Sequence, residues 1–167
     1  LISYSPIVKI KKNKIPKEKR MIMLRFERAT DIESPIYRDA LEIRLTVFVN
    51  EQNVSPAIEI DEKESSCIHV VGYDHNHNPI ATARLFPLDK ENYKVQRVAV
   101  LLSERGKQLG NLLMNEMETI ARENGAKRII LGAQNQALPF YEKIGYTVFG
   151  DEYEEAGILH HDVEKII

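Results

Sequence analysis

The chain has 167 residues, of which 43% are apolar and 29% charged, which is typical of one soluble domain and too apolar for a disordered chain. No apolar run approaches the ~18 residues that a membrane-spanning helix needs. Cys67 is the single cysteine, which excludes an internal disulfide and a cysteine-based zinc site. A lone cysteine also fits a reducing cytoplasm, where we expect the protein to act.

The net charge of −2 is unevenly distributed along the chain. Residues 1–20 contain seven Lys or Arg against one Glu, so the rest of the chain carries a net charge of −8. An acidic body argues against general nucleic-acid binding and favours a cationic partner. Three interpretations of the basic segment stay open: a leader or upstream extension, an arm that contacts an acidic partner, and an additional strand. We expect one domain over residues 21–167.

The first half of that domain alternates strand-like and helix-like patterns. Apolar and polar side chains alternate at the start, as in a half-buried strand, and apolar residues then recur at helical spacing. The predicted elements are a strand (23–28), a helix capped by Thr30 or Asp31 that runs to about Val49, a loop or short helix (51–66), and two strands (68–73 and 80–86) joined by a turn.

The second half begins with an apolar strand, 93–101, that the polar pair Gln96-Arg97 interrupts. An amphipathic helix follows residue 108 and ends at Gly125. The remaining predicted elements are a strand (127–131), a helix (136–144), an acidic solvated loop (151–155), and strands 146–149 and 158–163. Three consecutive strands exclude a doubly wound parallel sheet and indicate a mixed α/β sheet.

The strongest functional signal lies in residues 95–114, where a buried strand and a short turn lead into a helix. Backbone amides in the first turn of a helix have no intrahelical partner, and the helix dipole adds partial positive charge there. Arg105 and Lys107 add formal charge, and Gly106 and Gly110 let backbone approach a ligand or a packed neighbour. Such a loop suits a pyrophosphate, although a strand-to-helix turn with surface charges fits the same residues.

A second segment, residues 134–146, turns this pattern into a family resemblance. Together with residues 98–110 it resembles the acetyl-CoA signature of the GNAT superfamily of N-acetyltransferases, an Arg/Gln-x-x-Gly-x-Gly/Ala loop after a Val-rich strand. The resemblance covers residues 21–167 and implies the GNAT fold, a mixed, mostly antiparallel sheet flanked by helices. Four further places resemble the ElaA-type branch: residues 44–52, residues 59–61, His69 and residues 155–160.

Two positions depart from the family pattern. Gln108 stands where the fourth loop position is usually Gly, so its side chain must point away from a bound pyrophosphate, at a cost in affinity. Gln134 stands where the family often has Asn, with Asn135 beside it, and either amide is a candidate contact for the pantetheine arm.

The resemblance implies an N-acetyltransferase that uses acetyl-CoA as co-substrate, needs no metal, and acetylates a primary amine directly in a ternary complex. In this family, backbone amides of the fourth strand hold the thioester oxygen. Tyr141 matches the family's tyrosine position and would protonate the departing thiolate, since tyrosine stays protonated at neutral pH. The residues implied in cofactor binding are Val98, Ala99, Val100, Arg105, Gly106, Lys107, Gln108, Leu109, Gly110, Gln134, Asn135, Tyr141 and Lys143.

The acceptor amine must lose a proton before it attacks, and a carboxylate or His is the usual base. Glu51 and Glu155 rank first, because the ElaA-type resemblance sets both segments beside the acceptor cleft. The alternatives are Glu59, Asp61, His69 and His160.

We expect a small-molecule amine as partner, with no nucleic acid and no membrane, and the family also allows a homodimer. Two rival functions stay open: a non-catalytic CoA-binding or degenerate domain, which Gln108 would favour, and an enzyme like the acyl-homoserine-lactone synthases, which share this fold.

Overall fold

Strands and helices alternate in the order that the sequence predicts. The structure is a computed structural model that describes residues 3–4 and 24–167. Its strands are β1 (Ser3–Tyr4), β2 (Arg25–Ala29), β3 (Ile68–Tyr73), β4 (Pro79–Pro87), β5 (Asn92–Val100), β6 (Arg128–Gln134), β7 (Thr147–Glu155) and β8 (Ile158–Ile166). Its helices are α1 (Pro35–Arg44), the π-helix η1 (Leu45–Glu51), α2 (Pro56–Glu59), the short 3₁₀ turns η2 (Glu64–Ser66), η3 (Leu102–Glu104) and η4 (Asn135–Ala137), α3 (Leu109–Glu123) and α4 (Leu138–Lys143).

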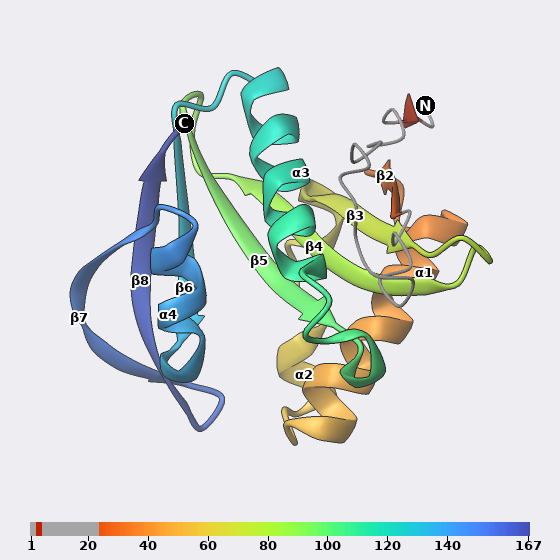
Figure 1. Ribbon diagram of the computed structural model, residues 1–167, viewed down its shortest axis with the longest axis horizontal. Coiled ribbons are helices and arrows are strands. Elements are labelled where there is room, and N and C mark those ends of the chain that lie inside the picture. The colour runs from red at the N-terminus through yellow and green to blue at the C-terminus, as the bar shows by residue number, and fades with distance from the viewer. Residues whose placement is uncertain (1–2, 5–23) are drawn as a thin grey trace, which may run out of the picture.

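All described strands form one sheet in the order β1-β2-β3-β4-β5-β6-β8-β7 (Figure 1). Every neighbouring pair is antiparallel except β5 and β6, which are parallel. The mixed, mostly antiparallel sheet expected from the resemblance is therefore confirmed. Of the basic segment, Ser3 and Tyr4 pair with β2, and residues 1–2 and 5–20 lie outside the described part. None of the described helices is long and apolar enough to cross a membrane.

Helix α1 begins one turn later than predicted. Its cap is Ser34, whose Oγ accepts a hydrogen bond from the Tyr37 amide at 3.1 Å, and Pro35 occupies the first helical position. The caps predicted at Thr30 and Asp31 are wrong, because the Asp31 carboxylate instead accepts from the Glu33 amide within the preceding turn. The helix then continues as the wider π-helix η1. This form is rare in proteins, and where it occurs it often lies at a functional site.

Two hydrophobic cores cover the opposite faces of the sheet. Successive side chains of a strand point to opposite faces, and in β3 the buried Val70 joins one core while Val71 joins the other. The first core lies under α3 and contains Leu109 and Leu113, and the second lies under α1 and contains Ile43. The sheet is therefore sandwiched between α3 and α1 (Figure 1).

Strand β5 carries a bulge where the sequence predicts an interruption. Thr82 pairs with Ala99 and Arg84 with Gln96, so a single residue of β4 opposes two residues of β5. The extra residue reverses the inside-outside pattern, because Val95 before the bulge lies in the α3 core and Ala99 after it lies in the α1 core.

Strands β5 and β6 are paired only at their beginnings in the described sheet. Residues 92–94 pair with residues 128–130, and the two strands then diverge, while β6 continues its pairing with β8 (Figure 1). A parallel pair that opens in this way exposes strand edges inside the molecule. Any ligand between the two strands would meet main-chain groups as well as side chains.

The last two strands are longer than predicted, and the acidic stretch 151–155 belongs to β7 instead of a loop. Ala156 (φ 53°) and Gly157 (φ 77°) make the two-residue turn between β7 and β8. Positive φ at both positions is the geometry that suits a tight hairpin. The loop prediction was wrong because β7 is the edge strand of the sheet, where charged side chains are tolerated in a strand.

Candidate active site

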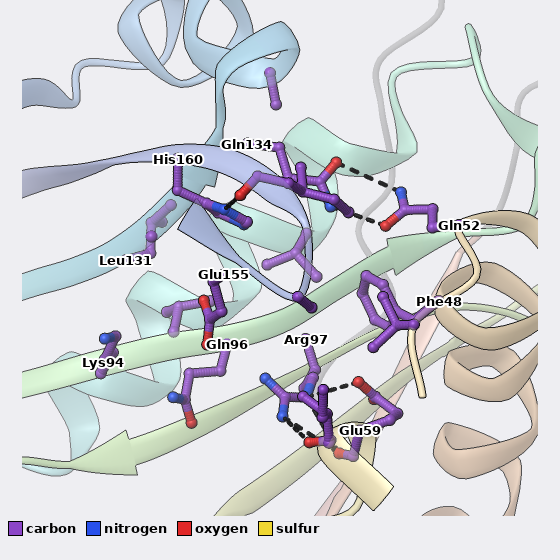
Figure 2. Close-up of a pocket in the computed structure, with 18 of the residues that line it drawn as sticks. Phe48, Gln52, Glu59, Lys94, Gln96, Arg97, Leu131, Gln134, Glu155 and His160 are labelled. Carbon is purple, nitrogen blue, oxygen red and sulfur yellow. Dashed lines mark hydrogen bonds and ion pairs between the residues drawn. The ribbon is translucent and has the colours of Figure 1, made fainter. Parts of the chain in front are cut away.

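A pocket of about 190 Å³ lies where β5 and β6 diverge. Its walls come from both strands, from α4, from the turn between β7 and β8, and from the segment between η1 and α2 (Figure 2). The chemically relevant side chains around it are Glu59, Arg97, Gln134, Tyr141, Glu155 and His160.

The β5 wall contains the bulge. The three β5 residues expected at the cofactor, Val98–Val100, differ in where the structure places them. Val98 lines the pocket. Ala99 is buried in the α1 core, so only its backbone remains for a ligand. The carbonyl of Val100 accepts a hydrogen bond from Nε of Arg105 at 3.0 Å, which ties the end of β5 to the following loop.

Helix α4 carries the predicted tyrosine. Tyr141 is only 6% exposed, yet it lines the pocket, and no described residue forms a hydrogen bond with its hydroxyl group. Burial raises the pKa of Tyr141 above its usual value, so the phenol keeps its proton at neutral pH. Lys143, in the last turn of α4, is exposed.

The loop before α3 has the left-handed geometry that favours glycine. Gly106 has φ 77°, and a Cβ built there would meet nothing within 4 Å. Gln108 has φ 63° and ψ 17°, is exposed, and precedes the buried Leu109. Gly110 packs against Phe140, whose ring would lie 3.2 Å from an added Cβ, so this glycine serves helix packing instead of ligand approach.

Both cations of this loop are already paired. Arg105 donates to Glu51 at 2.5 and 2.9 Å, and Lys107 donates to Glu104 at 2.8 Å. The hydrogen bonds from Arg105 lower the pKa of Glu51. Glu51 therefore lies with the loop before α3 and not in the lining of the pocket, so the structure does not bring it to the position expected of a base.

Only one of the two amides at the end of β6 faces the pocket. Gln134 lines it and donates to Oε1 of Gln52 at 2.8 Å, which closes one side of the pocket (Figure 2). Asn135 is turned away, because its Nδ2 donates to Glu152 at 2.7 Å and its Oδ1 lies 2.8 Å from Nδ1 of His161.

The hairpin of β7 and β8 supplies the predicted carboxylate and a histidine. Glu155 is exposed at the end of β7 and lines the pocket. His160 is buried, stacks on Tyr153, and has its Nδ1 2.7 Å from the carbonyl oxygen of Ile158. A carbonyl only accepts, so Nδ1 donates this hydrogen bond. Tyr153 lies over Gly132, where a Cβ would stand 2.3 Å from its hydroxyl oxygen.

The other carboxylates considered as bases belong to a buried ion network beneath the pocket. Glu59 and Glu64 both pair with Arg44, at 2.6 and 2.7 Å, and Asp61 pairs with Arg84 at 2.6 Å. These partners come from elements far apart in the chain, so the sequence did not reveal the network. His69, another of the alternatives, is also buried there, with its Nε2 2.8 Å from the carbonyl oxygen of Glu64.

Comparisons with known proteins agree on one family. Residues 37–167 match the family described as Acetyltransferase (GNAT) domain. The uncharacterized N-acetyltransferase YjcF of Bacillus subtilis is 42% identical over 130 residues, which are 77% of this chain and 91% of that protein. Protein ElaA of Escherichia coli is 34% identical over 124 residues, covering 72% of this chain and 80% of ElaA.

Solved structures resemble the fold closely. The crystal structure of Escherichia coli ElaA superposes with a TM-score of 0.74 at 28% identity, over 87% of this chain and 99% of that one. A GNAT family acetyltransferase from Elizabethkingia anophelis, solved with acetyl-CoA bound, gives a TM-score of 0.65 over 86% of this chain and 98% of that one. At 17% sequence identity, this similarity concerns the fold alone.

Proposed function

The chain belongs to the ElaA-like branch of the GNAT superfamily and is an acetyltransferase, and we propose that it transfers the acetyl group of acetyl-CoA to the primary amine of a small molecule. The observation that carries this proposal is the pocket between β5 and β6, because it brings a bulged strand edge, Tyr141 and Glu155 around one space. We further propose that the amine attacks acetyl-CoA directly while both substrates are bound. The reason is that β5, β6, α4 and the β7–β8 turn all line one pocket, which could hold the two reactants side by side.

The residues present fit acetyl-CoA. Free amides at the start of α3 and the open space around Gly106 favour a pyrophosphate at that helix end. Since Arg105 and Lys107 are paired with carboxylates, we propose that the backbone amides of residues 106–110 provide most of the anion binding. Val98–Val100 and Gln134 would then follow the pantetheine arm between the strands, with Lys143 nearer the adenosine end.

The reaction needs stabilisation of the negative charge that develops on the thioester oxygen. Main-chain amides at the β5 bulge are proposed to supply it, as preorganised donors in a partly dry site. Tyr141 is proposed to protonate the departing sulfur. Burial keeps the pKa of Tyr141 high, so the phenol would still hold its proton when the thiolate forms.

The acceptor ammonium must lose a proton before its nitrogen attacks the thioester, and this requires a base beside the acceptor end of the pocket. Of the two carboxylates that rank first in the sequence, Glu51 is engaged by Arg105, which leaves Glu155. We propose that Glu155 attracts the ammonium and takes its proton, directly or through water. His160 is a second candidate for the base, since it also lines this pocket.

Calorimetric titration with acetyl-CoA tests the proposal. We expect micromolar binding, about −8 kcal/mol, in the wild type. Gly106→Asp should abolish it, because Asp tolerates a positive φ but sets a negative charge beside the pyrophosphate. Gly150→Asp is the matched control: Gly150 has φ 72° and equally open surroundings, and it lies in β7 outside the pocket lining.

The outcomes separate the rival functions. Binding that is lost only in Gly106→Asp, followed by thiol release with members of an amine panel, supports the acetyltransferase as proposed. Binding without turnover on any amine favours a non-catalytic CoA-binding domain. No binding in the wild type contradicts the proposal, and turnover of S-adenosylmethionine would replace it with the synthase-like reaction.

A further inference from the structure

Arg97 has a backbone conformation that arginine rarely adopts. It sits inside β5 at the bulge with φ 57°, in the left-handed region that favours glycine. A non-glycine residue stays in that region only when its surroundings hold it there. The apolar pattern on either side of the bulge fixes where the register changes, but it does not fix the orientation of the peptide between Arg97 and Val98.

We propose that Arg97 is a positioning residue whose side chain locks the bulge onto the segment of α2, and so orients the main chain that faces the thioester. This inference rests on the acetyl transfer proposed above. Arg97, Glu59 and Asp61 together form a unit that we name the latch.

The latch is held by several contacts at once. Nε of Arg97 lies 2.9 Å from Oε2 of Glu59, and its Nη2 lies 3.4 Å from Oδ2 of Asp61. Nη2 also donates to the carbonyls of Ile58 and Glu59, at 3.2 and 3.3 Å (Figure 2). The guanidinium is a planar fork with fixed donor directions, so these acceptors fix the side chain and, through it, the backbone of residue 97.

The acceptors of the latch are themselves immobilised. The other carboxylate oxygen of Glu59 accepts from Nε of Arg44 at 2.6 Å, and both Glu59 and Arg44 are almost fully buried. Asp61 accepts two hydrogen bonds from Arg84, at 2.9 and 2.6 Å. Arg84 belongs to β4, pairs with Gln96 beside the bulge, and donates to its side chain at 3.1 Å. Both strands at the bulge are thus fastened to the same acidic segment.

Charge balance indicates that Arg97 acts through position and not through its charge. Its guanidinium has two carboxylates as neighbours, and burial lowers the pKa of Arg97 while Glu59 raises it. A cation neutralised in this way adds little to the stabilisation of a nearby oxyanion. What it can supply is the fixed direction of the following amide, which costs no reorganisation during the reaction.

The first test measures the conformation of residue 97 without any ligand. The ¹³Cα and ¹³Cβ chemical shifts of that residue report its φ and ψ, in wild type and in Arg97→Lys, which keeps the charge and loses the fork. We expect left-handed shifts in the wild type and a move toward extended values in Arg97→Lys. Arg128→Lys is the control, since Arg128 of β6 pairs with Glu164 of β8, away from the bulge. Unchanged shifts in Arg97→Lys would overturn the latch.

The second test links the latch to the thioester. The amide signal of Val98 is compared between complexes with CoA and with acetyl-CoA, which differ only in the acetyl group. We expect a difference in the wild type and in Arg128→Lys, reduced at least by half in Arg97→Lys. A wild type that binds neither ligand refutes the proposed function, while the ligand-free shifts still decide the latch. Binding without any difference at Val98 overturns its link to the thioester.

Glu59→Gln covers the case in which Arg97→Lys does not fold. This variant keeps the size of the side chain and removes one charge of the latch. We expect the ¹³Cα and ¹³Cβ chemical shifts of Arg97 to move in the same direction as in Arg97→Lys, but by a smaller amount. Wild-type shifts in Glu59→Gln would contradict the latch as firmly as wild-type shifts in Arg97→Lys.

Discussion

Gln108→Gly is expected to stabilise the protein although it removes a side chain. Gln108 has φ 63° at the start of α3, its side chain is exposed, and it makes no capping hydrogen bond to the helix. The residue therefore bears the strain of a left-handed backbone without a visible compensating contact. Glycine adopts this conformation freely, so the strain is relieved while nothing else in the described loop is lost.

The magnitude is the difference between two opposing effects. A left-handed backbone costs a non-glycine residue about 1–2 kcal/mol. Glycine in turn loses more freedom on folding, which takes back about 0.4–1 kcal/mol. The net expectation is a gain of about 0.5–1 kcal/mol in the free energy of unfolding. For a chain of this length, that raises the melting temperature by about 2 °C.

Thermal unfolding followed by circular dichroism measures the gain, with two comparison variants. Gln108→Ala keeps the left-handed strain and should melt as the wild type does. Gly106→Ala introduces the same strain at φ 77°, in space where a Cβ meets nothing within 4 Å, and should lose about 0.5–1 kcal/mol. A lower melting temperature in Gln108→Gly, or an equal gain in Gln108→Ala, would refute the reasoning.

The same variant bears on acetyl-CoA binding. The structure gives Gln108 a left-handed backbone that glycine also adopts freely, so we expect the variant to leave the shape of the loop unchanged. The dissociation constant for acetyl-CoA should therefore change by less than about threefold in Gln108→Gly. A tenfold or larger gain in affinity would mean instead that Gln108 obstructs the site.

Three further predictions concern the proposed chemistry and the ion network. Tyr141→Phe should lower kcat about 100-fold with little change in the KM for acetyl-CoA, because the proton donor acts only as the thiolate leaves; a loss confined to KM would contradict this role. Glu155→Gln should lower kcat/KM for the amine more than His160→Gln does, and the reverse order would make His160 the base. Burial raises the pKa of Asp61 and the hydrogen bonds from Arg84 lower it more, so its folded value lies below its unfolded value. The ionised Asp61 therefore stabilises the fold fully above about pH 4, and this stabilisation is lost as the pH falls further. Urea titrations at pH 7 should find the free energy of unfolding of Asp61→Asn lower than that of the wild type by about 1–3 kcal/mol. The difference between the two proteins should narrow below about pH 4.

The sequence predicted the fold wherever a local pattern determines an element. Apolar periodicity located α3 and the paired strands, and the polar pair Gln96-Arg97 marked the β5 bulge. The errors lie where the side-chain pattern does not determine the backbone conformation. The acidic residues 151–155 form an edge strand, since exposure on both faces leaves no alternation to detect. The cap of α1 lies at Ser34, three residues beyond Asp31, because several capping side chains precede this helix.

The site was predictable in its composition and less so in its pairings. Tyr141, Gln134, Val98 and Glu155 line one pocket, and their roles in it stay predictions. What the sequence could not reveal is which charges neutralise one another. The ion pair between Glu51 and Arg105 joins residues 54 positions apart, and only the fold decides that they meet.

Ion pairs of this kind reduce the number of acidic residues that can attract a cationic acceptor. The net charge of −8 outside the basic segment suggested a surface that attracts cations. Around the pocket, however, four of the five acidic residues in the segment from η1 to η2 pair with arginines at 2.5–2.7 Å: Glu51, Glu59, Asp61 and Glu64. Among the described lining residues, Glu155 is the carboxylate that no such pair neutralises. Under the proposed function, attraction of an ammonium therefore depends on Glu155 at the β7–β8 turn, while the four paired carboxylates hold the segments that shape the pocket.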